Sequence, residues 1–83
     1  MGLSARVLLD IDEEAHRALT KHGRHSIHHP DSSVLERLAA LTEEVGEVAK
    51  ALTYDGGGGL RDELIQLAAS AAGWAQHLPE DPI

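Results

Sequence analysis

Apolar positions in this chain recur at steps of three and four residues, which is the spacing of helices that bury one side. The first such pattern predicts a helix over residues 4–22. Ser4 can cap its start and Gly23 can end it, because serine accepts a hydrogen bond from the first turn and glycine tolerates the left-handed backbone that often follows a last turn. Residues 24–32 are then expected to form a loop.

A second helix is predicted from Ser33, whose spacing to Glu36 is that of a capping box, to residue 52 or 53. Four glycines at 56–59 end it, since glycine loses more backbone entropy in a helix than any other residue. The third helix is expected over residues 60–78. Because the connection is short, the second and third helices should be antiparallel neighbours.

The second predicted helix has two distinct faces. One is apolar and suited to packing, with Leu35, Leu38, Thr42, Val45, Ala49 and Leu52. The other places two carboxylates between two small residues, with Ala40, Glu44, Glu47 and Ala51 at steps of four, three and four. Small residues beside carboxylates favour close approach of another helix to this face.

The third predicted helix carries apolar residues on nearly every side, which is typical of a helix buried all round. Two other helices can hardly cover it in an 83-residue chain, so we expect a subunit interface there. The sequence therefore predicts one all-α domain over residues 1–83, with its core at about 33–78. The expected architecture is three main helices whose antiparallel pair forms a four-helix-type bundle in a homodimer or higher homo-oligomer.

Composition narrows the chemistry. The absence of cysteine excludes disulfides and thiolate metal sites, so a metal would need oxygen or imidazole ligands. A net charge of −7 argues against binding to a nucleic acid polymer or an anionic membrane. No apolar run is long enough to span a membrane and the first residues do not resemble a signal peptide, so the expected location is cytoplasmic.

The glutamates of the second and third helices are the main candidates for function. Glu44 and Glu47 lie on adjoining rows of one helix face, and the antiparallel pairing would bring Glu63 across to meet them. Carboxylate oxygens hold hard cations such as Mg²⁺, whose remaining positions are filled by water and substrate phosphates. A solvated helix face, with Glu47 paired to Lys50, is the ordinary alternative for such a run taken alone.

The motif Glu43-Glu44-x-x-Glu47, followed after fifteen residues by Glu63-x-x-Gln66, resembles the E-E-x-x-E and E-x-x-D signature of MazG-like nucleoside triphosphate pyrophosphohydrolases. The resemblance covers residues 35–78 and implies a helical oligomer that uses Mg²⁺, or Mn²⁺, to cleave a nucleoside triphosphate into a monophosphate and pyrophosphate. It implies that Glu44, Glu47, Glu63 and Gln66 are metal ligands and that Glu43 orients or deprotonates the attacking water. Gln66 departs from the family's aspartate, and its amide oxygen can coordinate a cation but brings no charge.

Other side chains are weaker candidates. Lys21, Lys50 and Arg61 are candidates for holding the triphosphate, and Tyr54 for stacking on a base. A cluster of imidazoles could in principle bind Zn²⁺, but loop and capping roles are favoured for His22, His25, His28 and His29. The glycines lack the lysine of a P-loop and are expected to be a flexible linker.

Two further classes compete with an enzyme. The first is a non-catalytic MazG-like helical oligomer that binds nucleotide, metal or a partner protein and has lost turnover through Gln66. The second is a plain oligomerisation module in which the glutamates are surface charge.

Overall fold

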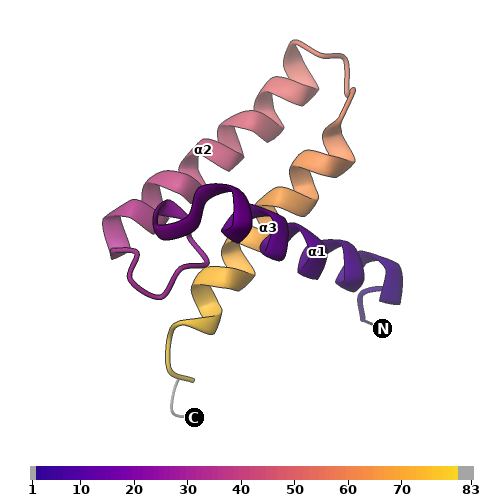
Figure 1. Ribbon diagram of the computed structural model, residues 1–83. Coiled ribbons are helices and arrows are strands. Elements are labelled where there is room, and N and C mark those ends of the chain that lie inside the picture. The colour runs from indigo at the N-terminus through magenta and orange to yellow at the C-terminus, as the bar shows by residue number, and fades with distance from the viewer. Residues whose placement is uncertain (1, 81–83) are drawn as a thin grey trace.

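The computed structural model describes residues 2–80, in which three α-helices and one short 3-10 helix occur without any strand (Figure 1). The elements are α1 (Ala5–His22), η1 (Gly23–His25), α2 (Val34–Thr53) and α3 (Leu60–Gln76). The all-α prediction is confirmed, and the predicted helix ends agree with the observed ones to within two residues.

Helix α1 begins and ends at the residues that the sequence indicated. The Ser4 side chain accepts a hydrogen bond of 3.1 Å from the Val7 backbone N–H. At the other end Gly23 has a φ of 55°, and its N–H donates to the Leu19 carbonyl. A side chain at this φ would be strained, so Gly23 fixes where the helix stops.

Helix α2 begins with the predicted capping box. Ser33 Oγ accepts from the Glu36 N–H at 3.0 Å, and the Ser33 N–H donates to Glu36 Oε1 at 3.2 Å. Two backbone donors at the helix start are thereby satisfied reciprocally, and the direction of the chain entering α2 is set.

The glycine segment joins α2 to α3 as a hydrogen-bonded turn. The Gly57 N–H donates to the Ala51 carbonyl at 2.7 Å, and Gly56, Gly57 and Gly59 have φ values of 62°, 88° and 77°. Three left-handed residues in four are accessible at little cost only to glycine, which explains the composition of this segment. The turn reverses the chain, and Figure 1 shows α2 and α3 as an antiparallel hairpin, as predicted.

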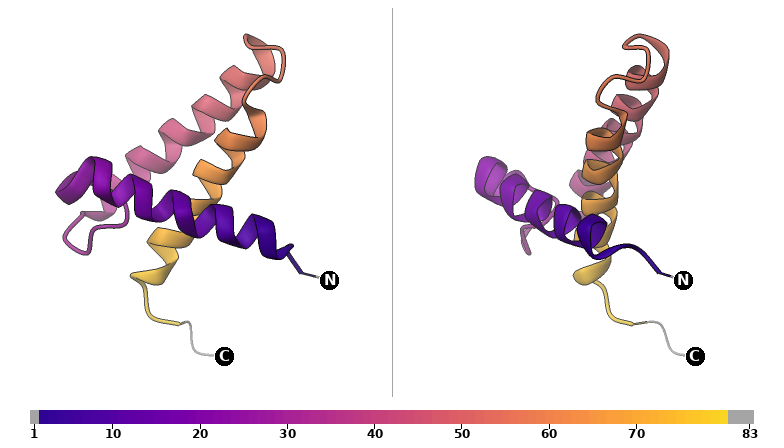
Figure 2. Two further views of the ribbon diagram at one scale, coloured as in Figure 1. Left: turned by 45° about the vertical axis from the view of Figure 1, so that its right-hand side comes forward. Right: turned by 90° about the vertical axis from the view of Figure 1, so that its right-hand side faces the viewer.

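Helix α1 crosses α3 on one side of this hairpin (Figure 2). Helix α3 therefore packs against both other helices, and its residues Ala69, Ser70 and Gly73 are buried. The buried His28 ring packs directly against Gly73. A Cβ added to Gly73 would overlap this ring and would lie only 3.2 Å from His28 Cγ.

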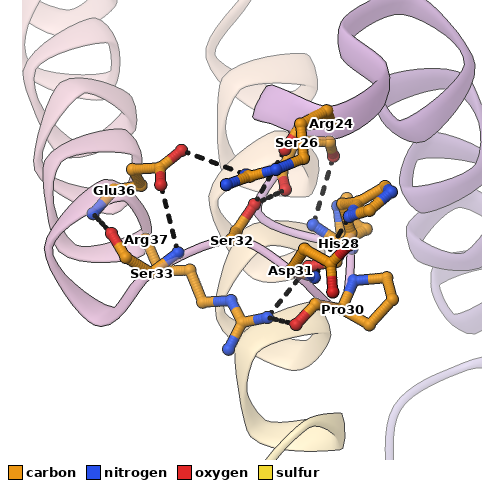
Figure 3. A network of polar contacts seen from close by, with 10 residues as sticks. Arg24, Ser26, His28, Pro30, Asp31, Ser32, Ser33, Glu36 and Arg37 are labelled. Atoms are coloured by element: carbon orange, nitrogen blue, oxygen red, sulfur yellow. Dashed lines mark hydrogen bonds and ion pairs between the residues drawn. The ribbon is translucent and has the colours of Figure 1, made fainter.

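The loop between η1 and α2 is held by buried polar contacts (Figure 3). Ser32 Oγ lies 2.5 Å from the Ser26 carbonyl oxygen, to which it donates. The guanidinium of Arg37, a buried residue of α2, donates to the carbonyl oxygens of His29 at 2.9 Å and Pro30 at 3.4 Å. These hydrogen bonds fix the loop against the start of α2.

The chain buries few large apolar side chains. The buried hydrophobic residues among those described are Ile27, Ala51 and Ala69. The apolar face of α2 points to solvent, with Leu35 77% exposed, so the packing expected of this face is not made within the chain. It is the stripe carrying the glutamates that faces inward, where Ala51 is only 2% exposed. In residues 2–80 no helix combines the length and apolar character needed to cross a membrane.

Candidate functional site

The inward stripe of α2 brings Glu44 to the junction of all three helices. Glu44 is half-buried and lines a cleft together with Ala40 and Glu43, whereas Glu43 itself is exposed at the rim. Glu47, one turn further along α2, is exposed and does not line this cleft. Of the three α2 glutamates that the sequence singled out, Glu44 is therefore the one held in the interior.

Glu63 on α3 lies near Glu44 across the hairpin. Both residues have an Oε2 atom that is buried and makes no hydrogen bond with the described residues. The pKa of Glu44 is raised, first by burial and next by the negative charge of Glu63, with smaller contributions from Glu43, Glu14 and Glu47. Converging carboxylates of this kind repel one another, and a cation or a shared proton would relieve the repulsion.

Helix α1 adds a charged pair that the sequence reasoning missed. Glu14 and Arg17 line the same cleft as Glu44, and Arg17 Nε donates to Glu14 Oε2 at 2.8 Å. This hydrogen bond is the largest cause of the lowered pKa of Glu14, and burial partly opposes it. The spacing of Asp10, Glu14 and Arg17 at steps of four and three was a usable signal, since it puts them on one row of α1.

Gln66 of α3 lines both clefts of the site. The first, of about 180 Å³, contains Glu43 and Glu44, and the second, of about 510 Å³, extends toward the start of α1. The two share Glu14, Arg17 and Gln66. Pockets for small ligands usually measure about 300–1,000 Å³, so the smaller cleft would hold only part of a nucleotide and the two together could hold all of it.

The predicted phosphate-binding residues are dispersed. Arg61 lies at the rim of the larger cleft, where its Nη2 is 2.8 Å from Asp10 Oδ2. Lys21 and Lys50 are exposed, and neither lines either of the two clefts. Tyr54 is 85% exposed beyond the end of α2 and also lies outside them. Of the predicted phosphate-binding residues only Arg61 therefore lines a cleft, and it is joined there by Arg6 and Arg17, which the sequence reasoning did not single out.

The described residues contain no group of three or more Asp, Glu, His or Cys side chains arranged closely enough to hold a metal ion. Mg²⁺ does not need such a cage, because it is commonly held by one or two carboxylates with water and phosphate oxygens completing its shell. The unpartnered oxygens of Glu44 and Glu63 fit that more open mode of binding.

The four clustered histidines do not converge on one point. His28 is buried, while His22 and His25 are exposed, and His29 Nδ1 accepts from the Asp31 N–H at 3.1 Å. The pKa of His28 is lowered, first by burial and then by the nearby His77, whose Nε2 lies 2.9 Å from the His28 carbonyl oxygen. The sequence favoured loop and capping roles for these histidines, and the packing role of His28 in the interior was not predicted.

Comparison with protein-family models, with curated proteins and with solved structures gave no match to this chain. The argument for a function therefore rests on the residues of the site.

Proposed function

We propose that this protein is a Mg²⁺-dependent, MazG-like nucleoside triphosphate pyrophosphohydrolase, with Mn²⁺ as a possible substitute. The observation that supports this most is the pair of buried, unpartnered Oε2 atoms of Glu44 and Glu63 at the junction of the helices. A buried carboxylate oxygen without a partner is costly, and two on facing helices suit a bound cation.

Each residue then has a distinct task. Glu44 and Glu63 would hold the cation, with Glu47 and Gln66 as its further ligands in the active assembly. Arg17 of α1 and Arg61 of α3 bind the phosphates, because both line the larger cleft. Bound Mg²⁺ would neutralise phosphate charge and lower the pKa of a coordinated water.

Glu43 is the proposed general base, since it lies at the rim of the smaller cleft and is exposed. It takes a proton from water as the water oxygen attacks the α-phosphorus. The bond from that phosphorus to the bridging oxygen breaks, and pyrophosphate leaves with the bridging oxygen. The products are a nucleoside monophosphate and pyrophosphate.

The active unit is proposed to be a cytoplasmic homodimer containing the four-helix-type bundle. The openness of the single chain supports an oligomer, since its radius of gyration is 13.4 Å while a compact chain of 83 residues has about 11.8 Å.

Pyrophosphate release from a panel of ribo- and deoxyribonucleoside triphosphates, with Mg²⁺, Mn²⁺ or EDTA, tests the activity. We expect metal-dependent release that falls at least a hundredfold in Glu44→Gln and Glu63→Gln. Asp55→Asn is the matched control, because it removes one negative charge from the exposed α2–α3 turn and should leave turnover unchanged. Wild-type release that persists undiminished in both glutamate variants would reject the assigned site.

A non-catalytic relative is the second candidate, and Gln66 is the observation that favours it. Gln66 lines both clefts but carries no negative charge, so the site has one carboxylate fewer than the family motif. If the wild-type protein binds nucleotide without releasing pyrophosphate and Gln66→Asp restores release, the natural chain is a binding protein built on the enzyme's scaffold.

A further inference from the structure

The exposed side of α2 forms a continuous face without charge. We define this α2 face by Leu35, Leu38, Thr42, Val45, Ala49 and Leu52, all of which are exposed. At 100° per residue, every charged residue of α2 lies on the other half of the helix. The Thr42 hydroxyl is satisfied within the helix, where it donates to the Leu38 carbonyl at 2.8 Å.

The α2 face belongs to the side of the hairpin away from α1. The α2 residues that share a cleft with α1, Ala40, Glu43 and Glu44, are on the opposite half of the helix. Helix α3 also carries an exposed leucine, Leu64, which is 46% exposed. Nothing within the described chain covers this side.

The chain as a whole exposes more surface than a compact monomer of its size, by an amount large enough for a dimer interface. The chain has an accessible surface of 5992 Å², whereas a compact monomer of 8.9 kDa exposes about 4,800 Å². The excess of roughly 1,200 Å² exceeds the roughly 800 Å² that each partner contributes to a stable interface of standard size.

The positions on the α2 face are spaced symmetrically about its middle, so an antiparallel copy of the same helix can place its own face residues opposite them. Reading inward from the two ends, Leu35 pairs with Leu52, Leu38 with Ala49, and Thr42 with Val45, all about the point between residues 43 and 44. A two-fold axis at that point would place each residue opposite its counterpart on an antiparallel copy of the helix.

Gly46 supports close contact at this position. It lies within α2, has no positive φ, and an added Cβ would meet nothing within 4 Å in its own chain. A helical glycine lowers helix stability relative to alanine, and nothing within the chain requires it. Near the proposed axis, its missing side chain would let the partner helix approach.

We propose that α2 packs antiparallel against α2 of a second copy of this chain, with Leu38 of each chain opposite Ala49 of the other. In this arrangement the hairpins of two chains form a four-helix bundle. The clefts of each chain remain on the outside of the bundle. The proposal does not depend on the nucleotide chemistry, because it concerns the opposite side of the hairpin.

Mass measurement by sedimentation equilibrium is the first test. The wild-type chain should have twice the 8.9 kDa mass, and Leu38→Glu should reduce it to the monomer mass or abolish the fold. Leu9→Glu on α1 is the control with equal charge change, since Leu9 and Leu38 are 46% and 48% exposed, and it should remain dimeric. A monomeric wild-type chain at tens of micromolar would overturn the proposal.

Cysteine cross-linking tests the register without relying on a disruptive charge. The chain has no cysteine of its own, so Leu38→Cys/Ala49→Cys should give a disulfide-linked dimer on mild oxidation. The two positions are about 16 Å apart along one helix, so they cannot bond within a chain. Neither single variant should cross-link. Cross-linking of either single variant, or none in the double variant, would overturn the antiparallel register.

Discussion

The contact between Gly73 and His28 allows a strict test of the packing at the centre of the structure. Replacing Gly73 with alanine would place a methyl group within the volume of the His28 ring, which lies against this turn of α3. The ring is buried, and the His28 carbonyl is engaged with His77, so displacement of the ring disturbs the loop that carries it.

Two opposing effects set the size of the change. Overpacking of a well-packed site costs about 1–3 kcal/mol. Alanine is the better helix former by about 1 kcal/mol, and this offsets part of that cost. We therefore expect Gly73→Ala to lower the free energy of unfolding by up to about 2 kcal/mol, and the melting temperature by roughly 4–8 °C for each kcal/mol lost.

A double-mutant cycle separates these effects. With His28→Ala the obstacle is gone, so adding Gly73→Ala should raise the free energy of unfolding by about 1 kcal/mol, which is the propensity term alone. Urea denaturation followed by helical circular dichroism, at one protein concentration for all four variants, measures each value. If Gly73→Ala is stabilising in both backgrounds, the packing of His28 against α3 described above is wrong.

Three further predictions concern buried charge. The pKa of Glu44 is raised above its ordinary value of 4.5, so the folded state holds this proton more tightly than the unfolded state. The metal-free protein should therefore lose stability as the pH rises from 4.5 through the raised pKa of Glu44. Glu44→Gln should remove this slope in thermal melts from pH 4 to about 8, and an unchanged slope would show that Glu44 is not its source. The lowered pKa of His28 has the opposite sign, since the unfolded state is protonated first, so stability should fall on acidification below the ordinary histidine value of 6.5, and His28→Ala should flatten that fall. Arg37→Ala should cost about 2 kcal/mol in urea denaturation, because it leaves two loop carbonyls without their charged donor, whereas exposed Lys50→Ala should stay within about 0.5 kcal/mol. An equal loss of unfolding free energy in Arg37→Ala and Lys50→Ala would mean that the loop does not depend on Arg37.

The local signals in the sequence were sufficient for the helices. Ser4, Gly23, Ser33 and the glycine turn set helix ends through contacts within three or four residues, or through backbone freedom at a single position. Such interactions depend on neighbours along the chain, so they can be read without knowing the tertiary structure.

The sequence was less informative about which residues meet. Glu44 and Glu63 were expected near one another because the short turn enforces an antiparallel hairpin. The approach of Glu14 and Arg17 was missed, because the direction in which α1 crosses α3 depends on side-chain packing between segments far apart in the chain. Lys50 and Tyr54 line neither cleft, which could not be read from their nearness in sequence to the glutamates.

The two faces of α2 illustrate the division between sequence and structure. Helical periodicity by itself determined that one face is apolar and the other acidic, because a period of about 3.6 residues sorts the side chains whatever surrounds the helix. Only the tertiary structure decided that the acidic face turns toward α1 and α3 while Leu35 and Leu38 remain exposed. The physical reason is that small residues beside the glutamates, such as Ala51, allow α3 to pack closely there, whereas the larger leucines are left for another surface.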